Sequence, residues 1–306
     1  MNKVLLSVMT AALLCGAISV AGAQQAFKTP DEAAAALASA AKASDMKALT
    51  TVLGPDGEDI ISSGDEVADA ATRQKFVAAY DVKHQIKMDG DNKATMIVGN
   101  DDFPVPIPIV RKDGQWKFDT AAGREEILFR RIGKNELDAI QSALAYVDAQ
   151  NDYADKDRTG AGVKTYAQRI VSQQGKKDGL YWPTAQGEEP SPLGELVAQA
   201  TAQGYKAGAG RTPFHGYYFK VLTKQGPAAP GGALDYVVKG NMIGGFGLVA
   251  YPAEYRNSGV KTFIVSHSGK VYEKDLGPNT AKIAEQMTAY NPDKTWEEVK
   301  DTELVK

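Results

Sequence analysis

The stretch NELDAIQSALAYVDAQNDYAD, residues 135–155, divides the chain into two parts with different patterning. Its apolar residues recur at helical spacing and form one stripe that faces a core: Leu137, Ile140, Leu144 and Val147. The same spacing leaves Asp138, Ser142 and Asp148 on the opposite, exposed face, and Asn135 stands where an N-cap is expected. Residues 123–155 are mostly helical by pattern, and we expect this long helix to begin a second domain.

The part before the long helix opens with shorter helices. Residues 29–32, TPDE, place a hydroxyl at the N-cap, proline at the first helical position and glutamate at the third, which predicts a helix to about Lys42. A second helix is expected at 46–53, where Gly54 ends it, and a third near 70–80.

An alternating pattern then replaces the helical one. Residues 84–88 and 94–98 flank a polar turn and predict a β-hairpin, and 116–119 predict another strand. Residues 103–109, FPVPIPI, alternate apolar residues with prolines, which cannot donate to a ladder, so their side of the strand must lie at a sheet edge or face solvent. Helices followed by an antiparallel sheet make an α+β unit of about 100 residues. This element order is similar to the cone-shaped fold of nuclear-transport-factor-2-like proteins, and the resemblance implies a curled sheet.

The part after the long helix is rich in predicted strands. A loop-rich segment precedes a short helix that starts at Ser191-Pro192 and runs toward Tyr205. Five strand candidates are separated by glycine turns: 216–223, 236–243, 245–251, 261–266 and 271–275. A helix at about 280–290 follows, and Trp296 and Val299 are expected to pin the tail onto the sheet. The predicted fold is α+β, with an N-terminal domain at 24–122 and a C-terminal domain of long helix plus antiparallel sheet at 123–306.

Residues 1–23 have the pattern of a secretory signal peptide. A cationic start precedes the apolar run 4–20, and Ala21-Gly22-Ala23 fits the rule for cleavage before Gln24. A lipoprotein signal is not indicated, because Cys15 follows two leucines and lies too early in the run. An uncleaved anchor needs about 20 apolar residues, so a cleaved signal is favoured, with no retained membrane span. We expect a periplasmic or secreted mature protein.

The mature composition excludes several chemistries. Cys15 leaves with the signal, so a cysteine nucleophile and an internal disulfide are both impossible. The net charge of −3 becomes −4 once Lys3 is removed, and the charges are mixed along the chain, so no nucleic-acid partner is indicated. The sequence has no Gly-x-Ser-x-Gly elbow and no phosphate-binding loop. His84, His215 and His267 have no metal-ligand spacing, and no cofactor is predicted.

His215 is the first binding candidate, because a titratable ring enters an aromatic strand there and can line a pocket. Tyr217 in the same strand, and Tyr181 and Trp182 in the loop-rich segment, are the others. The alternative interpretation makes these rings core residues and His215 a cap at the strand entry, and it is favoured because aromatic clusters are mainly core material.

One segment is similar to a calcium loop. Asp155 and Asp157 stand at alternate positions, and Gly160 follows where such a loop must turn. Position 12 of the loop is Tyr166 and not a bidentate glutamate, so a polar turn after the helix is favoured over a metal site.

Four stretches together resemble the exported bacterial proteins of domain-of-unknown-function family 2950: DGQWKFDT at 113–120, the helix at 135–154, GKKDGLYWP at 175–183 and FHGYY at 214–218. The resemblance covers nearly the whole mature chain and implies a bacterial envelope setting, with no activity or catalytic residue. Relatives often carry a more acidic loop after the long helix; here Asp157 matches, whereas Thr159, Ala161 and Thr165 replace the other acids. The final strands are also similar to the globular heads of pilin-like proteins.

Two functional hypotheses follow. The first is a non-enzymatic cell-envelope protein that binds another envelope protein or a wall component through its C-terminal domain, and the scarcity of catalytic groups favours it. The second is a small-ligand-binding or hydrolytic protein with a pocket near His215 or inside the N-terminal cone.

Overall fold

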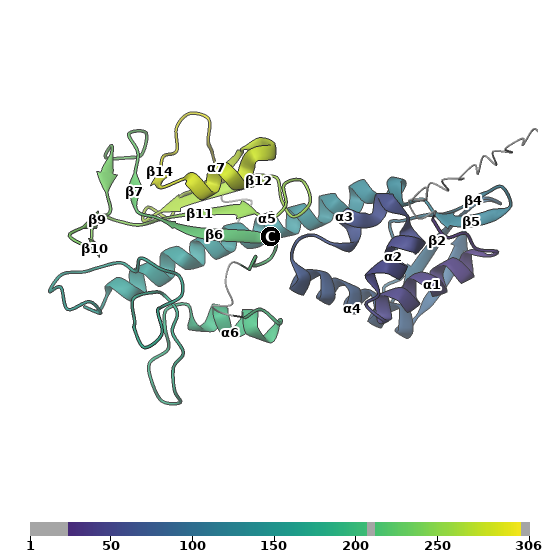
Figure 1. Cartoon of the computed structure of the whole chain (residues 1–306), viewed down its shortest axis with the longest axis horizontal. Coiled ribbons are helices and arrows are strands. Elements are labelled where there is room, and N and C mark those ends of the chain that lie inside the picture. Colours follow the sequence, from purple (N-terminus) through teal and green to yellow (C-terminus); the bar gives the residue numbers. More distant parts are fainter. Residues whose placement is uncertain (1–23, 207–211, 301–306) are drawn as a thin grey trace, which may run out of the picture.

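The computed structural model describes residues 24–206 and 212–300, which form two groups of elements joined by one long helix (Figure 1). The predicted signal peptide lies outside the described residues, so its cleavage stays a prediction. Within the described ranges, no helix is both long and apolar enough to cross a membrane.

The N-terminal helices follow the predicted order: α1 Pro30–Lys42, α2 Met46–Leu53, the short 3-10 helix η1 Pro55–Gly57, α3 Glu58–Ile61 and α4 Glu66–Val82. The predicted start of α1 is confirmed, because the Thr29 hydroxyl accepts a hydrogen bond from the Glu32 amide at 3.1 Å. Gly54 ends α2 with φ of 81°, a conformation that a side chain disfavours.

An antiparallel sheet packs against these helices. It contains β1 His84–Met88, β2 Lys93–Val98, β3 Phe103–Pro104, β4 Ile109–Lys112 and β5 Gln115–Phe118, in the order β1-β2-β4-β5 with β3 beside β2. The predicted hairpin is confirmed with His84 opposite Val98. Residues 103–109 are not one strand, because β3 ends at Pro104, one further amide, that of Val105, donates to the Met96 carbonyl of β2 at 2.8 Å, and Ile109 already belongs to β4. The described sheet is not curled, so the cone expected from the resemblance is not seen.

The helix α5, Thr120–Ala154, is longer than predicted and continuous. Asp119 caps it, accepting a hydrogen bond from the Ala122 amide at 3.3 Å. The prediction that Asn135 is an N-cap is therefore wrong; Asn135 lies in mid-helix, is buried, and donates to the carbonyl of Ser258 at 2.9 Å. The predicted domain boundary at 122–123 falls inside this helix.

The main C-terminal sheet packs on the second half of α5. Its strands are β6 Tyr217–Leu222, β11 Gly247–Pro252, β12 Lys261–Ser266, β13 Val271–Asp275 and β15 Glu297–Glu298, in the order β15-β13-β12-β11-β6, all antiparallel. The predicted strand 236–243 is instead a small hairpin, β9 Val237–Val238 with β10 Asn241–Met242. Lys239 and Gly240, both at positive φ, form its turn.

Smaller elements complete this part of the chain: α6 Gly194–Ala202, η2 Gly277–Asn279, α7 Thr280–Gln286, and a sheet of β7 Lys224–Gln225, β8 Leu234–Asp235 and β14 Ala289–Tyr290. The predicted tail contact is confirmed, because Val299 is buried and its amide donates to the Val271 carbonyl at 2.9 Å. Trp296 packs partly buried beside the sheet.

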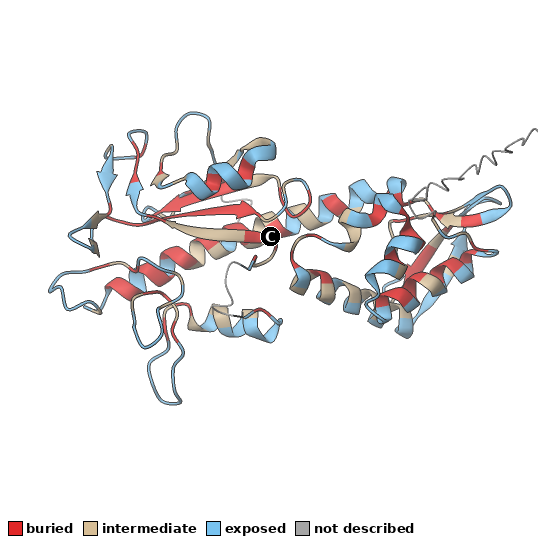
Figure 2. Ribbon diagram, in the orientation of Figure 1, coloured by how far each residue is buried: buried red, intermediate tan, exposed pale blue. Residues whose placement is uncertain are grey.

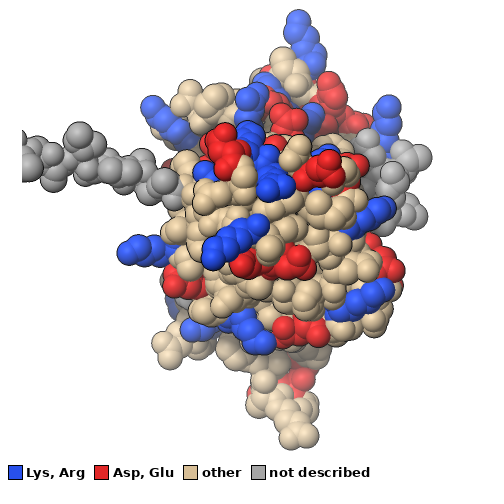
Figure 3. Space-filling view, turned by 90° about the vertical axis from the view of Figure 1, so that its right-hand side faces the viewer, with Lys and Arg blue, Asp and Glu red and all other residues tan. Residues whose placement is uncertain are grey.

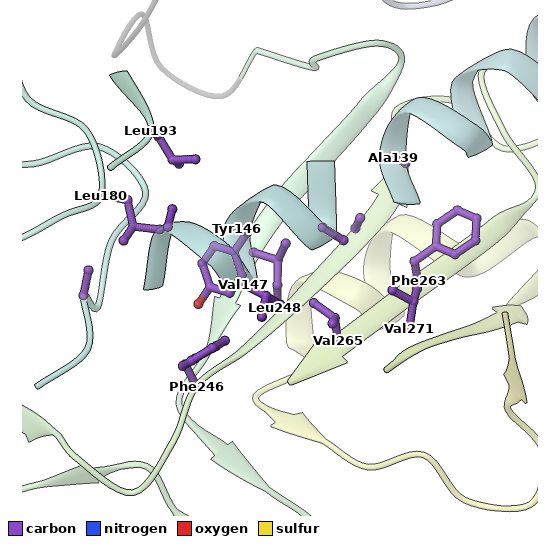
Figure 4. Close-up of a cluster of buried hydrophobic side chains, with 14 of the residues drawn as sticks. Ala139, Tyr146, Val147, Leu180, Leu193, Phe246, Leu248, Phe263, Val265 and Val271 are labelled. Atoms are coloured by element: carbon purple, nitrogen blue, oxygen red, sulfur yellow. The ribbon is translucent and has the colours of Figure 1, made fainter. Parts of the chain in front are cut away.

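Each group of elements has its own hydrophobic core (Figure 2). Leu37, Leu49, Met96 and Trp116 belong to the N-terminal core, which lies between the first helices and their sheet. The larger C-terminal core places one face of α5 against the sheet, where Tyr146 and Val147 face Leu248 and Val265 (Figure 4). A further cluster on the other face of this sheet includes Val249, Ile264 and Ala284 of α7.

Replacing two glycines of α5 by alanine should change the free energy of unfolding in opposite directions. A Cβ on Gly133 meets nothing within 4 Å, so Gly133→Ala should raise the free energy of unfolding by about 0.5–1 kcal/mol through helix propensity. A Cβ on Gly123 would lie 2.7 Å from the Ile107 Cα, so Gly123→Ala should lower it by about 1–3 kcal/mol. Urea denaturation of both variants tests this pair, and equal stabilities would contradict it.

Candidate functional site

Asp65 joins the two groups of elements through both of its carboxylate oxygens. It precedes α4 and is 1% exposed. Its Oδ1 caps α4 by accepting from the Ala68 amide at 3.1 Å. Its Oδ2 accepts from the Gly216 amide at 2.8 Å and from the Tyr205 hydroxyl at 2.9 Å, both in the C-terminal part. One buried carboxylate therefore holds both Tyr205 and Gly216, and Gly216 directly precedes β6.

Tyr205 is the centre of an aromatic group beside this carboxylate. Its ring lies edge-on to Phe214 at 5.0 Å and nearly parallel to His215 at 5.8 Å between centroids. Burial, and then the charge of Asp65, raise the pKa of the Tyr205 hydroxyl. The hydroxyl therefore stays protonated at neutral pH and donates to Asp65.

His215 pairs with Asp138 of α5. Nδ1 of the imidazole lies 2.7 Å from Oδ2 of Asp138, and the ring nitrogen is the donor because a carboxylate only accepts. Burial raises the pKa of Asp138, but hydrogen bonds from His215 and Lys134 outweigh it, and the pKa lies below its usual value. The expectation that Asp138 is on an exposed face is wrong, because its side chain is 24% exposed and engaged by His215.

A second set of contacts crosses the junction near Arg131. Its guanidinium donates to the carbonyls of Asp59 at 2.6 Å and Ile60 at 2.7 Å. The same group donates to Oδ1 of Asn257, whose amide donates to the Ser62 carbonyl at 2.9 Å. Burial lowers the pKa of Arg131, and these acceptors compensate the buried charge.

A groove of about 540 Å³ lies beside this junction, between α6 and the strand β6. Its lining comes from α5, α6, β6 and β11, from residues 170–171, and from residues 205–206 and 212–214 before β6. Aromatic and aliphatic side chains form most of the lining: Tyr146, Ile170, Leu193, Leu196, Val197, Ala200, Tyr205, Phe214, Tyr218, Phe219, Leu248 and Tyr251. Lys206 and Lys220 are its charged residues, and the described lining includes no carboxylate.

A second cleft, of about 760 Å³, lies between the N-terminal helices, the start of α5 and the loop at 254–257. Its charged lining is mainly acidic: Asp56, Glu58, Asp59, Glu125 and Glu254, with Arg124. Arg124 pairs with Asp59.

Across the described parts of the chain, no three histidine or carboxylate side chains are grouped as a metal site requires. At the N-terminal end of the molecule, positive and negative side chains are interspersed (Figure 3).

The other predicted binding residues lie in or against the core. Tyr217 is fully buried, and its hydroxyl donates to the Lys261 carbonyl at 2.9 Å. Tyr181 is half-buried against the C-terminal core. Trp182 is buried, with the Arg158 guanidinium 5.7 Å and the Lys177 ammonium 5.4 Å from its ring centroid. None of the four is in the lining of the groove, but Phe214 and Tyr218, the chain neighbours of His215 and Tyr217, are.

The calcium-loop candidates, Asp155 and Asp157, bond to groups of their own loop. Asp157 accepts hydrogen bonds from the amides of Ala161 at 3.1 Å and Gly162 at 2.9 Å, and these bonds, that from Gly162 first, hold its pKa below the usual value. Asp155 pairs with Lys164 at 3.2 Å. The two carboxylates thus serve a polar turn in this structure.

The remaining histidines lie on other elements and contact other residues. His84 begins β1, where it stacks on Tyr80 at 3.8 Å and its Nδ1 lies 2.9 Å from the Tyr80 carbonyl. His267 follows β12 and lies edge-on to Tyr236 at 6.0 Å. The structure therefore brings together His215 and Asp138 and no second histidine.

Sequence reasoning missed Asp65, Asp138 and the walls of the groove. Asp65 has an ordinary N-cap signal, because it precedes a helix, but nothing local indicates its contact with Gly216. The apolar spacing of Leu196, Val197 and Ala200 on α6 is a local signal for a face turned toward other elements, but it does not identify those elements.

A comparison with family models identifies the chain. The model described as "Protein of unknown function (DUF2950)" matches residues 24–299. The chain belongs to this family. No curated protein and no solved structure matches the chain. For this DUF2950 protein, the functional argument therefore rests on the geometry of the junction and the groove.

Asp65→Asn should show what the second carboxylate oxygen contributes. Asparagine retains the cap of α4 through Oδ1 but offers the Gly216 amide no acceptor at the second position. We expect the free energy of unfolding to fall by about 1–3 kcal/mol, because a buried donor loses its partner. The control is Asp45→Asn at the exposed cap of α2, which should change it by only a few tenths of a kcal/mol. Equal losses in urea denaturation would contradict the bridging role of Asp65.

Proposed function

We propose that the protein is an exported cell-envelope protein that binds a partner and is not an enzyme, with the groove between α6 and β6 as the binding site. The observation that carries the proposal is the groove itself, because buried and half-buried aromatic and aliphatic side chains surround a cavity of about 540 Å³. Cavities of this size and lining are the usual place for ligands. The proposed partner is another envelope protein or a wall component.

The export part of the proposal is supported by the signal pattern of residues 1–23. The family match begins at residue 24, directly after the predicted cleavage site. The proposed setting is the periplasm or the cell exterior, with no membrane span retained and no nucleic-acid partner. The proposed likeness of the C-terminal part to pilin-like heads is supported by an antiparallel sheet packed on one long helix.

The non-enzymatic part is supported by how the reactive groups are used. Asp138 is shared between His215 and Lys134, Asp65 is a structural acceptor, and Tyr217 is fully buried. These groups hold the wall of the groove in place.

The second candidate function is small-ligand binding or hydrolysis near His215. The His215–Asp138 pair favours it, because a carboxylate that orients an imidazole is also half of a general-base arrangement. Its other proposed location, a cone in the N-terminal part, has no curled sheet in the described structure to enclose a ligand.

Glutamate at position 200 should block the groove. Ala200 lines the groove on α6, whereas Ala198 on the same helix is exposed and lies outside its lining. A charged side chain buried against an apolar partner is costly, so Ala200→Glu should recover about tenfold less partner from an envelope extract than wild type. Ala198→Glu should recover as much as wild type. Equal recovery by the two variants, or no partner for wild type, would count against the proposal.

His215→Ala tests the second candidate. If the site hydrolyses esters, turnover of p-nitrophenyl acetate above the buffer rate should fall at least about tenfold in His215→Ala, because the general base is lost. His84→Ala, which changes the histidine on β1, should have no effect. Wild-type turnover that equals buffer, or that survives in His215→Ala, would remove this candidate.

A further inference from the structure

The strand β6 is an open edge of the main C-terminal sheet. In the sheet order β15-β13-β12-β11-β6 it stands last, and within the described residues it pairs with β11 alone. Edge strands present backbone donors and acceptors that can pair with another chain.

The register shows which groups of β6 point outward. The Ala253 amide donates to the Gly216 carbonyl at 2.9 Å, and pairing alternates along an antiparallel ladder, so even-numbered residues of β6 bond to β11. Odd-numbered residues therefore turn their N–H and C=O groups away from the sheet. Tyr217 does so, because it exchanges two hydrogen bonds with Phe214, at 2.8 and 3.1 Å.

Phe219 and Val221 form the open stretch of this edge. Their outward N–H and C=O groups have no hydrogen-bond partner among the residues that the structure describes. The edge is closed on either side, by Phe214 at Tyr217 and by the Thr288 carbonyl, which accepts from the Thr223 amide at 3.2 Å. The open stretch thus has the length of a short added strand.

The opposite edge of the same sheet is different. The edge strand there is β15, which has two residues, Glu297 and Glu298, both exposed, and Lys270 pairs with Glu298 at 2.8 Å. A short and charged edge resists pairing with another strand. The sequence of β6, YYFKVL, has no such protection apart from Lys220.

The groove described above runs beside the open stretch, because Tyr218, Phe219 and Lys220 of β6 form part of its lining. A strand added there would place alternate side chains toward the apolar walls from α5 and α6. Lys206 is exposed beside the groove, whose described lining includes no carboxylate, whereas the Lys220 amine is turned toward the end of α7, where it donates to the carbonyls of Glu285 and Met287. Charge complementarity therefore selects an occupant that carries acidic residues.

We propose that β6 binds an extended segment of a partner protein as an added strand, with alternate apolar side chains in the groove and acidic residues near Lys206. This rests on the proposed function of the groove and specifies the chemistry of its partner. Main-chain hydrogen bonds to Phe219 and Val221 supply affinity, and the side-chain contacts supply specificity.

Proline at position 221 separates backbone pairing from side-chain contact. Val221→Pro removes the outward N–H and leaves the ladder to β11 intact, as proline on an edge strand allows. Val221→Ala is the matched control that shortens the side chain and keeps the N–H. The probe is the tightest binder from an array of labelled ten-residue peptides in which apolar residues alternate with threonine and two aspartates end the chain. Fluorescence anisotropy measures its dissociation constant, and circular dichroism confirms that both variants fold.

The proposal predicts that Val221→Pro binds this peptide about tenfold more weakly than Val221→Ala, since one main-chain hydrogen bond is lost. Equal affinities for the two variants, with binding lost in Ala200→Glu, would leave the groove as the binding site and overturn strand addition. Strand addition would also be overturned if no peptide bound below about 1 mM, or if sedimentation showed a dimer of Val221→Ala that Val221→Pro could not form. Recovery of a partner from the envelope extract by Ala200→Glu and Ala198→Glu tests the groove as a binding site independently of strand addition.

Discussion

The continuity of α5 is the constraint on which the rest of the structure depends. A straight helix of 35 residues is about 50 Å long, which is enough to belong to two cores at once. Gly123, near its start, lies against the backbone of Ile107, whereas Tyr146, in its last third, donates to the Gly247 carbonyl at 3.2 Å. Polar residues between these two ends then meet neighbours from both groups of elements.

Those mid-helix contacts connect the fold to the groove. Arg131 bonds to carbonyls of the N-terminal part, and Asn135 bonds to the Ser258 carbonyl of the C-terminal part. Asp65 and Asp138 then hold Tyr205, His215 and Gly216, the residues that flank the entry into β6. The wall of the groove is thus fixed by buried hydrogen bonds that the apolar lining itself cannot provide.

The local parts of this arrangement could be predicted from the sequence, and the long-range parts could not. The cap at Thr29, the end of α2 at Gly54 and the hairpin after residue 84 depend on neighbours in the chain, so their signals are in the sequence. Asn135 and Asp138 were misjudged because a polar residue on a helix has the same local pattern whether it faces water or another element. The groove was missed because α5, α6, β6 and β11 supply its lining from segments far apart in the chain.

The two edges of the C-terminal sheet differ in length and chemistry. One edge is short and acidic, and the other is aromatic and lies beside an apolar groove. Hydrogen exchange of the wild-type backbone amides, measured with and without the tightest array peptide, compares both edges in one experiment. The account predicts slower exchange at Phe219 and Val221 when the peptide is bound, with Glu297 and Glu298 unchanged. Unchanged exchange in β6, or equal protection at both edges, would contradict it.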